Sequence, residues 1–155
     1  MMKKWLCLFI GCMAWSGVHA MTLEEQYSGL KNCHFDDIFY DQKTKQFGPG
    51  ATFFKENRHK LDICWKSEYI TSFCANGALT FHGLNVMELT LSGKGGEYFG
   101  IIFLNEEDTV RRVLSKRFSL VDLSGNINRL PSVDILPEEG YARIYCNLYN
   151  VREGE

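Results

Sequence analysis

The chain has 155 residues, with 17 basic and 19 acidic side chains and a formal net charge of −2. This mildly acidic balance excludes nucleic acid as a bulk partner, because binding to a phosphate backbone requires clustered positive charge. Aromatic residues make up 14% of the sequence. A disordered chain has few of them, so we expect a folded domain with a hydrophobic core.

The first twenty residues have the layout of a secretory signal peptide. Lys3 and Lys4 form a positive n-region, an apolar stretch covers residues 5–15, and Val18-His19-Ala20 fits a cleavage site. The apolar stretch is too short to span a bilayer as a helix. Cleavage after Ala20 leaves one domain, residues 21–155, with a formal charge of −4, because two lysines and no acid are removed. The short lysine n-region is typical of bacteria, so we expect a periplasmic or secreted protein.

Phe9-Ile10-Gly11-Cys12 is an alternative processing site, because it resembles the sequence at which lipoproteins are acylated. Cys12 would then carry the lipid and become the first mature residue. Phe9 stands where leucine is usual, so cleavage after Ala20 is favoured over a lipid anchor. No later stretch reaches the roughly 18 apolar residues of a membrane helix, so no transmembrane segment is expected after the signal is removed.

The N-terminal part of the mature chain predicts one helix and one strand. Thr22-Leu23-Glu24-Glu25 fits a capping box, and the apolar spacing that follows predicts a helix over Leu23–Lys31. Phe35–Tyr40 is the first expected strand. The polar stretch 41–50 ends in Gly48-Pro49-Gly50, which predicts a turn, and residues 51–59 fit either a helical turn or an extended segment.

From Leu61 onward the pattern predicts strands. Met87, Leu89 and Leu91 alternate with polar residues, which is the period of a strand with one solvated face. Short turns separate the candidates, including one at residues 92–96, and this favours an antiparallel meander. The expected strands are Leu61–Trp65, Tyr69–Cys74, Ala78–Phe81, Val86–Leu91 and Tyr98–Phe103.

The C-terminal part predicts a second helix and two more strands. Asn105 is the expected N-cap, because three acids follow it in the first turn, and Lys116 and Arg117 would close the helix. The strands are expected at Ser119–Leu123 and Tyr141–Tyr149, joined by a long polar loop, Ser124–Gly140. The sequence therefore predicts an α+β fold: a single antiparallel β-sheet of about five to seven strands, packed by one or two short helices.

Four cysteines remain after signal removal: Cys33, Cys64, Cys74 and Cys146. An even number in an oxidising compartment predicts two disulfides that brace the fold. We favour Cys64–Cys74 with Cys33–Cys146, because the first pair flanks the predicted turn at residues 66–68. Cys33–Cys64 with Cys74–Cys146 stays open as an alternative. A loop of about 100 residues is worth about 4–5 kcal/mol in the chain-entropy model, and a short hairpin loop less than about 3 kcal/mol.

Motifs for catalysis, metal binding or cofactor binding are missing from the sequence. There is no G-x-S-x-G or H-E-x-x-H, and no C-x-x-C pair of the kind that binds zinc or carries redox chemistry. His34 and Asp36 fall on one face of an extended segment, a pattern that fits surface polarity. We therefore expect no enzyme, no metal and no cofactor.

A binding module for another exported protein is the leading hypothesis, of the inhibitor or immunity type that acts against an exported hydrolase or toxin. Two polar loops are candidate contact regions. Their candidate partner-binding residues are Lys94, Glu97 and Tyr98 in the first, and Asp134, Glu138 and Glu139 in the second. An envelope structural or assembly factor, which would be a lipoprotein if Cys12 is acylated, and a small-ligand carrier are the alternatives. The oligomeric state is left open.

Overall fold

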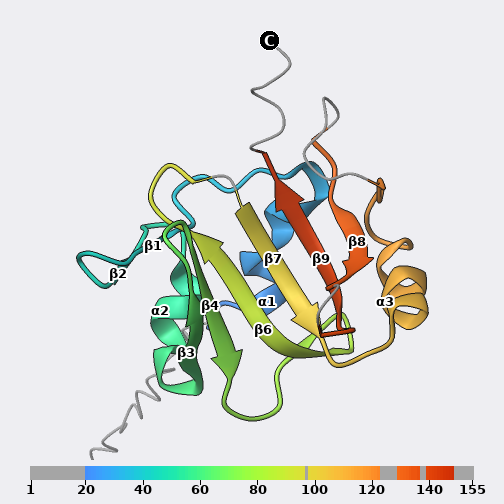
Figure 1. Ribbon diagram of the computed structural model, residues 1–155, viewed down its shortest axis with the longest axis horizontal. Coiled ribbons are helices and arrows are strands. Elements are labelled where there is room, and N and C mark those ends of the chain that lie inside the picture. The colour runs from blue at the N-terminus through green and yellow to red at the C-terminus, as the bar shows by residue number, and fades with distance from the viewer. Residues whose placement is uncertain (1–19, 97, 123–128, 137–138, 149–155) are drawn as a thin grey trace, which may run out of the picture.

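A seven-stranded antiparallel sheet is the main element of the computed structural model, which describes residues 20–96, 98–122, 129–136 and 139–148 (Figure 1). The strand order is β3-β4-β6-β7-β9-β8, with β5 paired to β6. This architecture confirms the predicted α+β fold with one antiparallel sheet. The strands are β3 (Leu61–Lys66), β4 (Ile70–Ala75), β5 (Thr80–Phe81), β6 (Leu84–Ser92), β7 (Tyr98–Phe103), β8 (Ser132–Ile135) and β9 (Ala142–Asn147).

The predicted meander forms the larger part of this sheet. β3, β4, β6 and β7 lie side by side in chain order and are all antiparallel. The turn expected at residues 92–96 joins β6 to β7, and Gly95 takes a positive φ of 75° there, which glycine adopts without strain. β9 then returns beside β7, and β8 forms the far edge.

Short helices pack on one side of the sheet and at its β8 edge. α1 (Leu23–Gln26) lies behind the sheet in Figure 1, and α3 (Glu107–Leu114) packs beside β8 and β9. The other helical elements are η1 (Ser28–Asn32), α2 (Thr52–Glu56) and η2 (Arg58–Lys60), and β1 (Tyr40–Asp41) with β2 (Gln46–Phe47) forms a separate hairpin. The segment 51–59 that fitted two conformations is therefore mainly helical.

The capping box at the start of α1 is confirmed. The Thr22 hydroxyl accepts a hydrogen bond from the Glu25 N–H at 3.2 Å, and the Glu25 carboxylate accepts one from the Thr22 N–H at 2.8 Å. The helix predicted over Leu23–Lys31 is shorter than expected, because it changes at Tyr27 into the 3₁₀ turn η1. This change brings Tyr27 and Leu30 onto the sheet, where both are fully buried.

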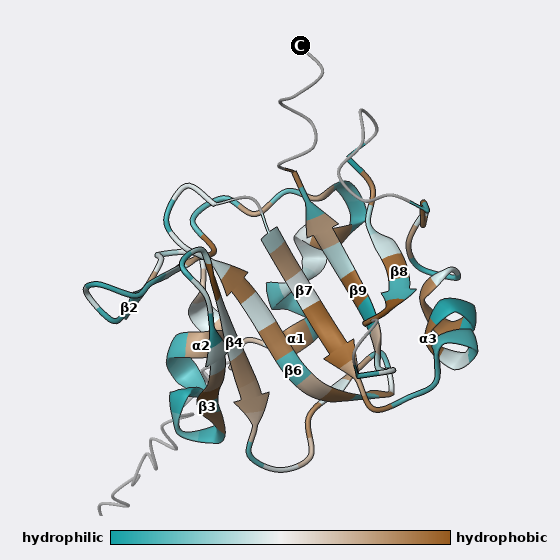
Figure 2. Ribbon diagram, viewed as in Figure 1, coloured by the Kyte–Doolittle hydropathy of each residue, from teal (hydrophilic) through white to brown (hydrophobic). Residues whose placement is uncertain are grey.

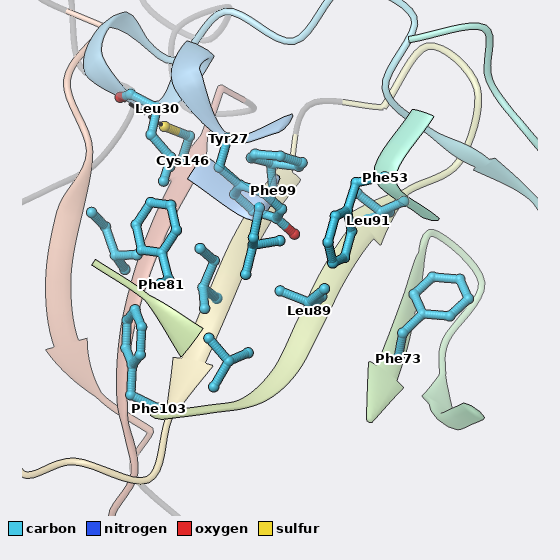
Figure 3. Packing of buried hydrophobic residues seen from close by; sticks show 14 of the residues in the cluster. Tyr27, Leu30, Phe53, Phe73, Phe81, Leu89, Leu91, Phe99, Phe103 and Cys146 are labelled. Carbon is cyan, nitrogen blue, oxygen red and sulfur yellow. Dashed lines mark hydrogen bonds between the residues drawn. The ribbon is translucent and has the colours of Figure 1, made fainter. Parts of the chain in front are cut away.

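The hydrophobic core lies between the helical elements and the sheet (Figure 3), and Figure 2 shows hydrophobic residues in the central strands β6 and β7. Tyr27 is at its centre: its ring lies 4.1 Å from that of Phe99, and its hydroxyl donates a hydrogen bond to the Gly100 carbonyl at 3.3 Å. Alternate residues of each strand point into this core. They include Phe73 of β4, Leu89 and Leu91 of β6, Phe99, Ile101 and Phe103 of β7, and Ile144 and Cys146 of β9.

Two disulfides join the cysteines in the favoured connectivity, Cys33–Cys146 and Cys64–Cys74. Their Cα–Cα distances are 5.5 and 5.6 Å, which are ordinary for a disulfide. The first bridge is fully buried and fastens the end of η1 to β9. The second joins neighbouring strands β3 and β4 near the surface.

The strand predicted over Phe35–Tyr40 is wrong except at its last residue. Only Tyr40–Asp41 is extended and paired, as β1. Asp37 has a positive φ of 60°, a left-handed conformation that a strand cannot contain. The preceding residues instead pack Phe35 and Ile38 against the core from a chain of turns.

The helix predicted after Asn105, which is α3 (Glu107–Leu114), begins one residue later than predicted. Glu106 occupies the N-cap position, whereas the Asn105 side chain accepts a hydrogen bond from the Asn85 N–H at 2.7 Å and so joins the loop to β6. Lys116 and Arg117 follow the helix rather than closing it. A tertiary partner for Asn105 outweighed its local preference for the cap.

The pairing after this helix also differs from the prediction. In place of a strand over Ser119–Leu123, Val121 makes a single parallel bridge to Ser132; Leu123 lies outside the described residues. The expected loop Ser124–Gly140 contains β8, whose alternating Val133 and Asp134 pair with β9. Pro131 precedes this edge strand directly, a position that proline tolerates.

Candidate functional site

One face of the sheet has no helix packed on it among the described residues, and this face is the candidate site (Figure 1). Side chains alternate across a strand, so every second residue of each strand stands on this face. Strand pairing then arranges them in rows. The first row runs Asp62, Cys74, Glu88, Ile102, Arg143, Asp134, and the second runs Trp65, Ser72, Thr90, Gly100, Tyr145, Ser132.

A bulge in β3 changes what the edge of this face presents. The pairing of β3 with β4 shifts between Ile63 and Trp65, so Cys64 is the extra residue. The shift places Trp65 opposite Ser72, on the helix-free face, and leaves its side chain 54% exposed. A bulge therefore sets an exposed tryptophan at the sheet edge, beside the Cys64–Cys74 disulfide.

The face is hollowed into a groove with a volume of about 520 Å³, called the sheet groove below. It spans β3 to β9, and the segment that follows β8 contributes Leu136 and Glu139 to its rim. Apolar and charged groups both line it. The lining residues are Cys64, Trp65, Ile70, Ser72, Cys74, Glu88, Thr90, Tyr98, Ile102, Leu136, Glu139 and Arg143.

Gly100 leaves the middle of the second row without a side chain. A Cβ at this position would lie 2.8 Å from Thr90 Oγ1 and 3.3 Å from Tyr145 Cβ. Any larger residue would push these neighbours apart. Glycine therefore allows Thr90 and Tyr145 to pack closely beneath the groove.

A cluster of polar and aromatic side chains around Arg143 forms the β8–β9 side of the face. The Arg143 guanidinium donates to both carboxylate oxygens of Asp134, at 2.6 and 3.1 Å, and to the Tyr98 hydroxyl at 3.3 Å. It also lies 4.4 Å from the centre of the Tyr145 ring. Burial is the largest single effect and opposes its charge, but the hydrogen bond to Asp134 and the electrostatic effects of Tyr98, Asp134 and Tyr145 together outweigh it, so the pKa of Arg143 is raised. Arg143 therefore stays charged and is held rigidly over an aromatic ring.

Glu88 is the half-buried acid at the centre of the first row. Burial raises the pKa of its carboxyl and the Glu139 carboxylate adds to the rise, while a hydrogen bond from Ser72 opposes it. One of its carboxylate oxygens and the sulfur atoms of Cys64 and Cys74 all lie within 4.8 Å of one another. Because these sulfurs are bonded to each other, they are not thiolates and do not form a metal site.

The structure brings together three of the six predicted partner-binding residues. Tyr98 and Glu139 line the sheet groove, and Asp134 holds Arg143 at its side. Lys94 is exposed in the β6–β7 turn, where it lies near Tyr69 and away from the groove. Glu97 and Glu138 lie outside the described residues.

Sequence reasoning missed Trp65, Glu88 and Arg143, which lie on the same face as Tyr98. The alternation along β6 did place Glu88 on a solvated face, but only strand pairing shows that Arg143 shares it. The exposed side chains of His34 and Asp36 lie 2.8 Å apart, consistent with the surface role expected for them.

Comparison with known proteins returns no match: no family model fits the chain, and no curated protein or solved structure is significantly similar to it. Among the described residues, none of the helices has the length and apolar character needed to cross a membrane. The two disulfides are compatible with a periplasmic or extracellular location.

Proposed function

We propose that this protein is an exported binding module of the inhibitor or immunity type, and that it engages another exported protein through the sheet groove. The observation that carries the proposal is a sheet face that the chain's described helices leave open and that is hollowed and lined by Trp65, Tyr98 and Arg143. Tryptophan, tyrosine and arginine are the side chains that contribute most to binding energy at protein interfaces.

Rigidity of the groove supports this role. Arg143 is fixed by Asp134 and Tyr98, so ordering it on binding costs little conformational entropy. Ile102 is buried in the floor, while Trp65 projects at the rim and is free to enter a pocket on a partner. An organised floor with an exposed aromatic anchor is the arrangement expected of a protein-binding surface.

The charge of the groove indicates what the partner presents. Arg143 is already paired with Asp134, whereas Glu88 and Glu139 add two carboxyl groups. The groove is therefore acidic overall, and it complements a basic side chain with an apolar stem, such as lysine or arginine. An exported hydrolase or toxin with a basic segment fits this surface.

Replacing Trp65 by alanine is expected to weaken partner binding about thirtyfold or more, the loss typical of a buried aromatic anchor. Leu104→Ala is the matched control, because Leu104 is a similarly exposed apolar residue, at 58%, that does not line the groove. Affinity capture from the native periplasm with wild type and both variants, followed by titration of any captured protein, measures the effect.

The proposal is supported if a captured partner binds the wild type and Leu104→Ala with equal affinity and binds Trp65→Ala much more weakly. The proposal fails if no specific partner is recovered at any salt concentration. It also fails if the recovered partner does not distinguish Trp65→Ala from the control.

A small-ligand carrier is the second candidate, because 520 Å³ falls within the volume range of ligand pockets. Mass spectrometry of protein isolated from its native envelope tests this candidate and the N-terminus together. We expect a mature chain that begins at Met21 and a native mass without adduct. A co-purified ligand would favour the carrier, and a diacylglyceryl group on Cys12 would favour an anchored envelope factor.

A further inference from the structure

The two disulfides occupy different environments, although the sequence predicts the same bracing role for both. Cys33 and Cys146 are both completely buried and close a loop of 113 residues. Cys64 is exposed, Cys74 is half-buried, and the bridge between them closes only 10 residues in the wall of the sheet groove. An external thiol can therefore reach the second bridge, whereas the first is shielded by the core.

A proton-carrying group stands beside this exposed bridge. Cys74 pairs directly with Glu88 across β4 and β6, which places the Glu88 carboxyl within 4.8 Å of both sulfur atoms. Glu88 is half-buried, so its carboxyl is partly shielded from water. A carboxyl group at this distance is in a position to exchange a proton with a leaving or returning thiol, directly or through one water molecule.

We propose that Cys64–Cys74 is a thiol–disulfide exchange site that accepts two electrons from a cysteine pair of a protein substrate, with Glu88 as its proton donor and acceptor. This activity is independent of the proposed binding partner. It makes the groove a reaction site as well as a contact surface.

The exchange proceeds in two steps. A substrate thiolate, formed by loss of its proton to water, attacks the exposed Sγ of Cys64; the Cys64–Cys74 bond breaks, and Cys74 takes the electron pair and a proton from Glu88. The second substrate thiol then gives its proton to Glu88 and attacks the substrate sulfur of the mixed disulfide. Cys64 leaves as a thiolate and is protonated by water. The substrate dithiol becomes a disulfide, and Cys64 and Cys74 become thiols.

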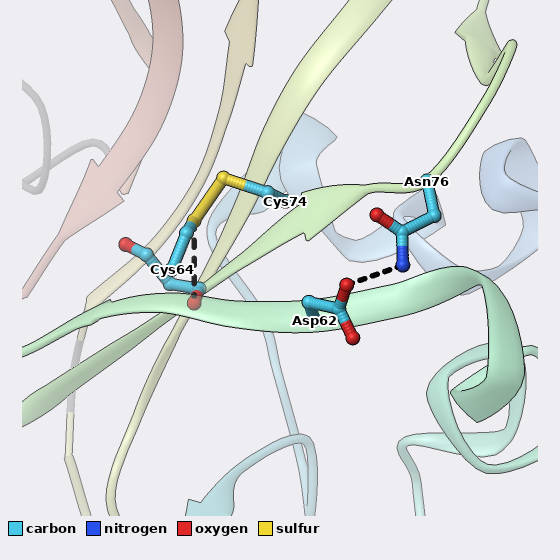
Figure 4. The surroundings of a disulfide bond; sticks show 5 residues. Asp62, Cys64, Cys74 and Asn76 are labelled. Carbon is cyan, nitrogen blue, oxygen red and sulfur yellow. Dashed lines mark hydrogen bonds between the residues drawn. A yellow bond between two sulfur atoms is a disulfide. The ribbon is translucent and has the colours of Figure 1, made fainter.

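In the reduced form, the new thiol of Cys64 has a hydrogen-bond acceptor nearby. Its Sγ lies 3.7 Å from the carbonyl oxygen of Ser72, drawn as a dashed line in Figure 4, and a thiol can donate to this acceptor whereas a disulfide sulfur cannot. The side-chain bond from Asn76 to Asp62 keeps β3 and β4 joined beside the bridge. Opening the disulfide therefore does not require the strands to separate.

Exchange kinetics with dithiothreitol as the dithiol test the proposal. Samples are quenched with acid and alkylated, and peptide mapping reports each bridge separately, so Cys33–Cys146 is an internal reference. We expect Cys64–Cys74 to be reduced at least about tenfold faster than the reference, because the rate of thiolate attack depends on access to the sulfur atoms. Reduction of both bridges at the same rate would contradict the proposal.

Glu88→Gln separates a chemical role from exposure alone. We expect it to slow reduction of Cys64–Cys74 about tenfold, less than the roughly hundredfold of many positioned acids, because a thiolate is already a good leaving group. The reduction rate is divided by the concentration of dithiothreitol thiolate at each pH. This normalised rate should fall for the wild type as pH rises through the Glu88 pKa, and it should stay constant for Glu88→Gln. Among the described residues, the other titratable or charged groups that line or adjoin this part of the face are Glu139, Arg143, Tyr98, Tyr145, Asp134 and Asp62.

Glu139→Gln is the matched control, because it removes a charge from the same groove at a residue that is not among the three groups gathered at the bridge. Its rate should still fall as pH rises, but with the midpoint moved to lower pH, because the Glu139 carboxylate contributes to the raised pKa of Glu88. All variants should keep the wild-type melting temperature. Equal rates and equal pH profiles for Glu88→Gln and wild type would overturn the proposal, even if Trp65→Ala abolished partner binding.

Discussion

Replacing Cys33 and Cys146 together by alanine is expected to lower the free energy of unfolding by about 4–5 kcal/mol. The bridge closes a loop of 113 residues, and the entropy that it removes from the unfolded chain grows with loop length. It also holds η1 against β9, where both sulfur atoms are buried. Urea denaturation followed by tryptophan fluorescence, with and without the two substitutions, measures the change.

The matched control is the double variant Cys64→Ala with Cys74→Ala. Its loop spans 10 residues, so the same model gives a loss of about 2–3 kcal/mol. Equal losses for the two double variants would show that loop entropy does not decide the contribution of these bridges. A larger loss for the Cys64–Cys74 pair would assign the main structural role to the exposed bridge.

Truncating Tyr27 to alanine is expected to cost about 3–5 kcal/mol of folding stability, the range measured for large aromatic side chains in protein cores. Tyr27 is fully buried and its ring contacts Phe99, Phe54 and Phe81, so its removal leaves a cavity between the helical segment and the sheet. Thermal and urea unfolding of the purified variant measure the loss.

Tyr27→Phe separates packing from hydrogen bonding at this position. It keeps the ring and removes only the hydroxyl that donates to the Gly100 carbonyl, so a loss of about 1 kcal/mol is expected. If Tyr27→Phe were as damaging as Tyr27→Ala, the hydrogen bond rather than the buried ring would hold the helical segment to the sheet.

Local sequence patterns predicted an element correctly where the residues that stabilise it are close to it in the sequence. The capping box at Thr22, the alternation through Leu89 and Leu91 and the turn at residues 92–96 all depend on nearby residues, and the structure contains each of them. Met87 departs from the predicted alternation, because the pairing of β6 with β7 shifts there and Val86 is buried instead. Two of the predictions that failed involve distant partners. Asn105 bonds to β6 instead of capping its helix, and Val133 pairs with β9 inside an expected loop.

The candidate site was only partly predictable for the same reason. Tyr98, Asp134 and Glu139 were proposed as parts of two separate loops, whereas strand pairing places them around one groove. A one-residue shift in register would move every side chain of a strand to the other face. The rows that bring Glu88 and Arg143 together therefore depend on pairings that no single segment contains.

The sequence by itself determined the class of fold, the helix cap, most of the strands and the favoured pairing of the four cysteines, because periodicity, turn residues and cysteine number act locally or by count. Only the tertiary structure decided that the two bridges differ. Packing buries Cys33–Cys146 beneath η1, whereas a bulge and strand register set Cys64–Cys74 beside Glu88 on the open face. Burial and proximity are properties of pairs of distant segments, and they are formed only when the sheet is assembled.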